Sequence, residues 1–419
     1  MQPDLDSLRA AAPDLDRRYQ AFRSQKLSLD MTRGKPCGEQ LDLSNGLLTI
    51  LGEADFRAAD GTDCRNYGGL DGLPEAKALF AAFLELSPAE VLLGDNSSLA
   101  LMHQSVAFAM SHGVPGGKPW SEEKARMLCP VPGYDRHFAI CEHFGIEMVN
   151  VPMTDEGPDM ERVEELAAAD PAVKGIWVVP RYQNPLGVSC SDRVVERLAK
   201  MRPAAPDFRV FWDNAYAHHH LVEQPRPLAN LHAACKAAGN PDRTFVFGST
   251  SKVSHAGAGV AMMGGSERNV AWLRGHRSRF TIGPDKLVEL RHVRFFRDMA
   301  GIGAHMAKHA AILKPKFEAV ERVLTRELGG TGLARWTRPE GGYFVSLDTA
   351  PGGAKAVVKL AADAGVKLTE AGATFPYGRD PEDRNIRIAP SLPKLAEIES
   401  AMEVLSVCVK LAALGKTGA

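Results

Sequence analysis

Short runs of consecutive apolar residues recur along the middle of the chain and alternate with stretches whose apolar residues are spaced three and four apart. The runs lie at 90–94, 125–130, 146–151, 174–180, 209–214, 243–248 and 259–264. Each is brief and seldom alternates with polar residues, which is typical of strands buried on both faces of a sheet. Between them, 160–169 and 192–201 show helical spacing on an otherwise charged surface. Strands that alternate with helices predict an α/β fold, doubly wound around a mainly parallel, seven-stranded sheet.

The chain after residue 300 shows a different pattern. A long stretch of helical periodicity leads to a strand that starts with two glycines, and a helix, a second strand and a final helix follow (303–328, 341–348, 354–364, 385–389 and from Pro393). Helices grouped around few strands predict a smaller α+β domain. We therefore expect a large domain over 46–299 and a small domain made of 1–45 with 300–419. The absence of a repeat and of a low-complexity linker favours close packing of the two.

The composition limits the classes of function. Lys and Arg number 50 and Asp and Glu number 51, so the formal net charge of −1 argues against binding to nucleic acid. The seven cysteines are scattered without a zinc-ligand spacing, which is typical of reduced thiols in a cytoplasmic protein. The sequence shows neither a signal peptide nor a stretch apolar enough for a transmembrane helix. We expect a cytoplasmic protein that binds neither nucleic acid nor membranes.

Polar side chains follow several of the predicted strands, where open parallel sheets bind their ligands. The stretch 96–98, Asn-Ser-Ser, opens a helix, where it can cap the helix or bind an anion. Tyr134 follows a proline turn and offers either a packed ring or a face for a planar ligand. Asn184 stands in an Asn-Pro-x-Gly stretch, which is first of all a turn.

An acid and a lysine also stand at strand ends. Asp213 ends an apolar strand, although aspartate is rarely buried without a partner, and Tyr216 follows it closely. Lys252 comes directly after another buried strand, among hydroxyls and glycines, where a lysine becomes a candidate for a desolvated, reactive amine. Together the strand ends offer an anion cradle, a flat ring, an amide, an acid, a phenol and a lysine. This set suits pyridoxal phosphate held as a Schiff base.

The ordered set of motifs resembles the fold-type I pyridoxal-phosphate aminotransferases of class I/II, and among them the aspartate-aminotransferase-like, MocR-like group. A lone SxxK is common, whereas the whole set in this order is highly specific. The motifs span residues 32 to 388: TRGKP from Thr32, NYGGLDG from Asn66, NSS from Asn96, PGY from Pro132, NPLG from Asn184, DNAY from Asp213, STSK from Ser249, GGYF from Gly341 and NIRI from Asn385.

The resemblance implies a role for each residue around the cofactor ring. Lys252 would bind the cofactor aldehyde as a Schiff base and then move the substrate proton. Asp213 would pair with the pyridine nitrogen and favour the protonated ring, which is the electron sink of the reaction. Tyr216 and Asn184 would donate to the phenolic oxygen of the ring, and Tyr134 would stack on its face.

The resemblance also implies how the phosphate and the substrate are held. Tyr67 would reach the phosphate from a partner subunit, so that each site of a homodimer is built from two chains. Arg387 would bind the α-carboxylate of the substrate as a bidentate fork, with Gly34 and Asn184 near it. Cis peptides are expected before Pro132 and Pro185. Within one chain, the phosphate and the adjoining part of the cofactor would be bound by Asn96, Ser97, Ser98, Ser249 and Ser251.

One position departs from the family pattern, and two questions stay open. The arginine that normally follows the lysine by eight residues and pairs with the phosphate is Val260 here. His255, Arg279 and Lys286 are candidates to replace it, and Arg33, Arg279 and Lys286 are candidates to meet a second substrate carboxylate. The triplet 218–220 contains three histidines, but consecutive side chains diverge, so we interpret them as polar loop or interface residues and expect no metal site.

These observations favour an aminotransferase that moves an amino group between an L-amino acid, aspartate- or glutamate-like, and a 2-oxo acid. Another pyridoxal-phosphate reaction, a β-lyase, racemase or decarboxylase, would use the same residues and is the nearest alternative. A sensor domain of a transcriptional regulator is the more distant one. The 31 residues before Thr32 are too few for a DNA-binding domain, and the net charge also argues against it.

Overall fold

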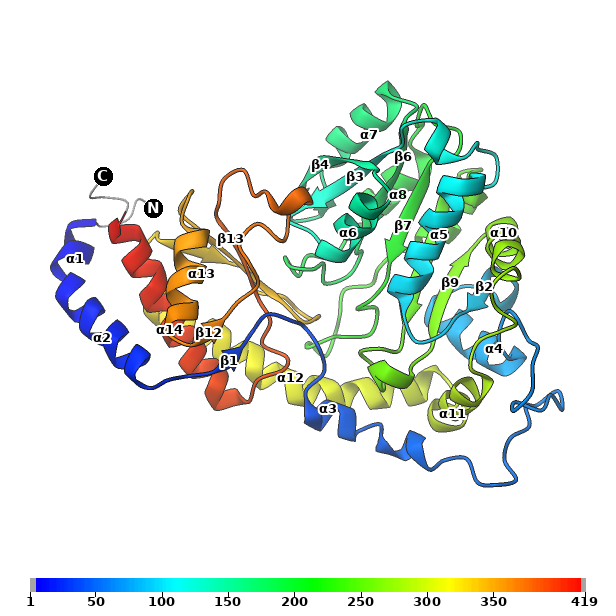
Figure 1. Ribbon diagram of the computed structural model, residues 1–419, viewed down its shortest axis with the longest axis horizontal. Helices are drawn as coiled ribbons and strands as arrows, with labels where there is room; N and C mark the ends of the chain where they lie inside the picture. Colours follow the sequence, from blue (N-terminus) through cyan, green and yellow to red (C-terminus); the bar gives the residue numbers. More distant parts are fainter. Residues whose placement is uncertain (1–4, 416–419) are drawn as a thin grey trace.

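Eight strands form the central sheet in the computed structural model, which describes residues 5–415 (Figure 1). β9 runs antiparallel to both of its neighbours and the short β5 runs antiparallel to β4, whereas the other neighbouring strands pair in parallel, so the sheet is mainly parallel. All seven predicted strands are confirmed. The eighth, β5, has two residues and is too short to give an apolar run. Across the sheet the order is β2 (Val91–Leu93), β9 (Ala261–Gly265), β8 (Thr244–Ser249), β7 (Arg209–Asp213), β6 (Val173–Val178), β3 (Arg126–Val131), β4 (Glu147–Thr154) and β5 (Gly157–Pro158).

Helices cover both faces of this sheet, and alternate strand residues pack against opposite layers. In β7, Phe211 belongs to one hydrophobic cluster, whereas Val210 and Trp212 belong to the other. Burial on both faces explains why the strands are continuously apolar. The Phe211 layer contains α5 (Ser98–His112), α6 (Asp135–His143) and α10 (Glu267–Arg277). The opposite layer contains α4 (Pro74–Phe83), α7 (Met160–Ala169), α8 (Asp192–Lys200), α9 (Leu231–Ala237) and α11 (Lys286–Phe296).

The smaller part of the molecule combines both ends of the chain around a separate hydrophobic cluster (Figure 1). The predicted strand at 341–348 begins only at Val345, because Gly341 and Gly342 make a bridge and a turn, with Gly342 at φ +80°. The antiparallel sheet that contains this strand has the order β10 (Ala334–Trp336), β11 (Val345–Thr349) and β13 (Asn385–Ile388). In a second, two-stranded sheet, β1 (Leu29–Asp30) pairs in parallel with β12 (Val366–Lys367). The helices are α1 (Leu5–Ala10), α2 (Ala12–Ser24), α13 (Ala354–Asp363) and α14 (Leu395–Gly415).

The long helix α12 (Met299–Leu328) joins the two parts, and the short helix α3 (Gly38–Asp42) packs against it. It begins four residues before the expected start, because Asp298 caps it by accepting from the Gly301 backbone N–H at 2.9 Å. Ile302 lies in the core of the large sheet and Leu313 in that of the smaller part. The helix therefore contributes to both cores, and the exact domain boundary at 299/300 stays a prediction.

The described helices are all too short or too polar to cross a lipid bilayer; this finding covers residues 5–415.

Candidate active site

Asp213 ends β7 and is buried, and its two carboxylate oxygens have different surroundings. Oδ2 accepts a hydrogen bond from Nε2 of His137 at 3.0 Å, and the His137 ring stacks on Trp177 with centroids 4.4 Å apart. Oδ1 is buried and has no hydrogen-bond partner within residues 5–415. One oxygen is thus held by the protein, and the other is free to accept from a ligand N–H.

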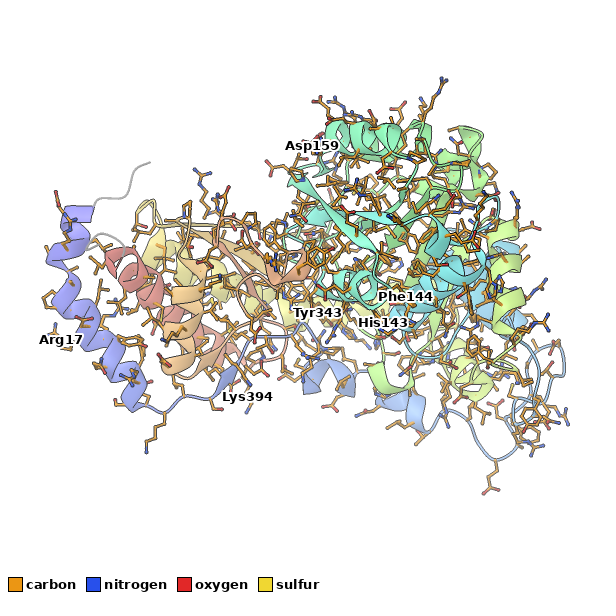
Figure 2. All side chains as sticks on the ribbon, turned by 45° about the horizontal axis from the view of Figure 1, so that its top comes forward. Arg17, His143, Phe144, Asp159, Tyr343 and Lys394 are labelled. Atoms are coloured by element: carbon orange, nitrogen blue, oxygen red, sulfur yellow. The ribbon has the colours of Figure 1, made fainter. Side chains whose placement is uncertain are left out.

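Lys252 lies just beyond β8, with its Nζ 5.0 Å from the centroid of the Tyr216 ring. Burial lowers the pKa of this lysine, and the Asp213 carboxylate opposes the shift. A lysine with a lowered pKa is neutral, and hence nucleophilic, more of the time than an exposed one. The backbone carbonyl of Lys252 accepts from His219 Nε2 at 3.2 Å and from the Tyr343 hydroxyl at 3.5 Å. Figure 2 marks Tyr343 where the two parts of the chain meet.

The two tyrosines expected at the ring lie close to each other and to the Asp213 carboxylate. Burial raises the pKa of Tyr216 well above its ordinary value, so the phenol keeps its proton and remains a donor. Burial also raises the pKa of Tyr134, whose ring meets that of His137 edge-on at 4.9 Å. The peptides before Pro132 and Pro185 are both cis, as predicted.

The residues expected at the phosphate come together at the N-terminus of α5. Ser97 caps this helix by accepting from the Ala100 backbone N–H at 3.4 Å. Ser249 donates to Ser251, and Ser251 donates to the carbonyl of Asn96 at 3.0 Å. Hydroxyls and free helix N–H groups at one place form a suitable anion site.

None of the candidates to replace the missing arginine is distinguished by its contacts among the described residues. Val260 is buried, and its backbone N–H donates to Thr250. His255 Nε2 lies 3.2 Å from the carbonyl of Leu41, and Nζ of Lys286 donates to the carbonyl of Gly68 at 2.7 Å. Arg279 is exposed, as is Arg33, the further candidate for a second substrate carboxylate.

Arg387 lies on β13 and is buried at the edge of the site. Its Nη1 donates to Asp135 Oδ1 at 2.8 Å and to Asn184 Oδ1 at 3.4 Å, and its Nη2 donates to Thr369 at 3.3 Å. Nε is buried without a partner in the described chain. The Phe344 ring packs 5.0 Å from the guanidinium carbon.

The segment that carries Gly34 packs against the same group. A Cβ at Gly34 would lie 2.5 Å from Cζ of Phe344, so the close approach requires glycine. Thr369 donates to the carbonyl of Thr32 at 2.7 Å, which ties this N-terminal segment to the surroundings of Arg387.

The histidine triplet makes three separate sets of contacts. His218 lies 3.3 Å from the carbonyl of Phe83, His219 contacts Lys252, and His220 lies 2.7 Å from the Tyr182 hydroxyl. Over residues 5–415, no cluster of His, Cys, Asp and Glu has the arrangement of a metal site.

His137, Asp135 and Thr369 are the residues that sequence reasoning missed. His137 stands three residues after Tyr134, in the first turn of α6, and this one-turn spacing is the only signal that points to it. Tyr67 is 87% exposed, and its expected contact with the phosphate of a partner subunit stays a prediction.

The arrangement fits pyridoxal phosphate. Among residues 5–415, Asp213 Oδ1 is a buried acceptor without a partner, as a protonated pyridine nitrogen requires, and Lys252 offers an amine of lowered pKa for the aldehyde. The N-terminus of α5 offers donors for the phosphate. The free edge of Arg387 suits a substrate carboxylate.

Comparisons with known proteins agree with this geometry. A family model described as aspartate amino-transferase matches residues 4–418. The chain is 48% identical over 402 residues to an aspartate aminotransferase of Corynebacterium glutamicum, covering 96% of this chain and 93% of that protein. A crystal structure of an aspartate transaminase from the same organism superposes with a TM-score of 0.96 at 47% identity, covering 99% of this chain and 98% of the other.

A more distant structure shares the fold. It is an α-aminoadipate aminotransferase of Thermus thermophilus in complex with N-(5'-phosphopyridoxyl)-L-leucine, with a TM-score of 0.77 at 21% identity and coverage of 96% and 97%. The matching family model spans nearly the whole chain, and the relatives are full-length matches. The present chain therefore belongs to the aspartate aminotransferase family and is a pyridoxal-phosphate-dependent aminotransferase.

Proposed function

We propose that this protein transfers the amino group of an L-amino acid with an acidic side chain, aspartate or glutamate, to a 2-oxo acid. The observation that carries the proposal is that Asp213, Lys252 and Arg387 all lie near Tyr216, with Asp213 Oδ1 left without a partner among residues 5–415. The preference for an acidic side chain is supported by the relative from Corynebacterium glutamicum that is named for aspartate.

Each residue of the site has a separate role in this reaction. Bound pyridoxal phosphate supplies an electron sink that stabilises negative charge at the substrate Cα. Asp213, held by His137, would keep the pyridine nitrogen protonated through Oδ1. Lys252 Nζ would hold the cofactor aldehyde and would carry a proton to and from the substrate. Arg387 would fix the substrate carboxylate and so limit the orientations of the substrate at Lys252.

A panel of amino donors tests this proposal. We expect aspartate and glutamate to give a kcat/KM at least tenfold above that of alanine or leucine, because a second carboxylate adds a charge-assisted contact worth about 1.5–3 kcal/mol. Similar values for acidic and apolar donors would overturn the preference for an acidic side chain, but not the aminotransferase reaction. Ammonia or carbon dioxide as the main product would instead favour the lyase or decarboxylase alternative.

We also propose that the protein works as a homodimer. In one chain Tyr67 is almost fully exposed, and the family resemblance implies that this tyrosine binds the phosphate in a partner subunit. A partner subunit that brings its own Tyr67 to this site would account for the exposure.

A further inference from the structure

Asp135 contacts Arg387, the arginine proposed to bind the substrate carboxylate. The reaction as proposed above gives Asp135 no role. Asp135 is the first residue of α6, directly after Tyr134, and belongs to the large part of the molecule. Arg387 belongs to the smaller part, on β13. Oδ1 of Asp135 accepts from Nη1 of Arg387 at 2.8 Å, so this ion pair joins the two parts across the site.

The hydrogen bonds divide the guanidinium of Arg387 into an occupied end and a free edge. Nη1 has two hydrogens, and both are used, by Asp135 and by Asn184. Nη2 uses one hydrogen, toward Thr369, at the longer distance of 3.3 Å. Nε is buried and has no partner among residues 5–415. In a guanidinium the Nε–H and one of the two Nη2–H bonds point the same way, which is the pair of parallel donors that a carboxylate takes in bidentate fashion.

We propose that Asp135 is a positioning residue, which holds the Nη1 end of Arg387 so that the Nε–Nη2 edge stays in place for the substrate carboxylate. The inference rests on the proposed function, because it takes Arg387 as the carboxylate site. Without Asp135, Nη1 keeps only the 3.4 Å contact to Asn184, and the guanidinium can turn about its long side chain. A bidentate contact loses strength when either donor moves out of line.

A carboxylate beside an arginine can also act as a competitor of the substrate, and the geometry distinguishes the two roles. A competitor would occupy the two-donor edge, whereas Asp135 contacts Nη1 alone. The side chain of Asp135 is 32% exposed, whereas that of Arg387 is 6% exposed. Its other oxygen, Oδ2, is 4.0 Å from Nε of Arg136, too far for a hydrogen bond.

Three variants of the holoenzyme test the proposal: Asp135→Ala, Asp135→Asn and Asp192→Ala. Asp192 is the matched control because it is also the first residue of a helix, α8, and is exposed. The dissociation constant of succinate, an unreactive dicarboxylate, is measured by the change in cofactor absorbance, together with KM and kcat for the best amino donor.

We expect Asp135→Ala to raise the dissociation constant and KM about tenfold and to leave kcat at saturation within about twofold. Asp135→Asn keeps an oxygen in front of Nη1, so we expect a smaller rise of about two- to threefold, and Asp192→Ala should match the parent. Tighter succinate binding by Asp135→Ala would identify a competitor and overturn the proposal. Unchanged binding, or equal losses of kcat and of cofactor affinity, would overturn it as well.

Folding and the proposed function are checked in the same experiment. If Asp135→Ala does not bind cofactor, the dissociation constant of succinate is compared between Asp135→Asn and the parent. Equal dissociation constants then overturn the proposal. If the parent enzyme itself neither binds succinate nor transaminates, the proposed function fails before any variant is compared. Failure of the proposed function is therefore seen in the parent enzyme, and failure of the role of Asp135 is seen in the variants.

Discussion

At the scale of single residues, the site depends on buried polar groups that are only half satisfied. Asp213 uses one oxygen on His137 and leaves the other without a partner in the described chain, and Arg387 uses Nη1 and leaves Nε without one. A buried polar atom without a partner costs about 1–3 kcal/mol. Ligands that satisfy these atoms recover that free energy, so the same atoms that destabilise the free site favour binding of cofactor and substrate.

His137 tests this account, because it holds Asp213 without touching the substrate. We expect His137→Phe to lower kcat/KM about 10- to 100-fold, as is usual when the partner that orients a functional group is lost. The phenylalanine ring keeps the stack on Trp177, so packing is largely preserved. Steady-state kinetics with saturating pyridoxal phosphate measure the effect. His143→Phe, an exposed change on the same helix, is the control, and equal activities of the two variants would contradict the role of His137.

The residues that we expect around the cofactor ring could be selected from the sequence because each stands at a strand end within a recognisable motif. Asp135 and Thr369 could not be predicted from the sequence in this way. Their importance comes from contact with Arg387 over 252 and 18 positions of sequence, and neither contact follows from local spacing. The cation at the phosphate could not be predicted either, since Val260 replaces the usual arginine with a buried apolar residue.

At the scale of elements, α12 connects the smaller part of the molecule to the lysine. His305 Nε2 donates to the carbonyl of Val253, next to Lys252, at 2.8 Å. His309 Nδ1 accepts from Gln40 of α3 at 3.0 Å, and Gln40 also donates to the Tyr343 hydroxyl at 2.9 Å. Residues from three distant segments thus fix the backbone around Lys252. The strands themselves were easier to predict, because burial on both faces leaves a continuous apolar run that any window of the sequence reveals.

The buried His309 makes stability depend on pH. Burial, with His305 nearby, lowers the pKa of His309 from 6.5 to about 4. Between these values the unfolded chain binds a proton that the folded chain does not, so stability is lost as pH falls through this range. At pH 5 the loss from this one group is about 2 kcal/mol.

The variant His309→Gln removes this titration and keeps a polar side chain. We expect its Tm to fall less between pH 7 and pH 5 than the Tm of the parent does, and His143→Gln, an exposed change, to behave like the parent. Thermal unfolding of the holoenzyme at the two pH values measures it. A drop in Tm as large as that of the parent would contradict the assignment of the pH dependence to His309.

At the scale of the whole molecule, exposed apolar residues gather where we expect the partner subunit. Tyr67, Phe280 and Ile282 are 87%, 55% and 61% exposed. The loops that carry them are adjacent, because a Cβ on Gly283 would lie 2.8 Å from the carbonyl of Gly68. Contiguous exposed apolar side chains are typical of interaction surfaces. The sequence of one chain could suggest this dimer only through resemblance, since the contacts that we expect to complete the site would belong to a second copy.

Mixed dimers test whether the sites are composite. Lys252→Ala and Tyr67→Ala should each be severely impaired alone. When the two variants are co-expressed, half of the dimers should be mixed, and each mixed dimer should contain one intact site. We expect about a quarter of the parent activity per total subunit. Activity no greater than that of the separately purified variants would contradict a site shared between subunits.

The central claim, transamination at Lys252, is tested most directly by a single half-reaction. The holoenzyme is mixed with excess aspartate or glutamate in the absence of any 2-oxo acid, and the 2-oxo acid formed per subunit is counted. We predict about one equivalent per site, with the nitrogen retained on the enzyme as pyridoxamine phosphate, and none for Lys252→Ala. Continued formation of product with release of ammonia or carbon dioxide, or the same yield from Lys252→Ala, would contradict the account.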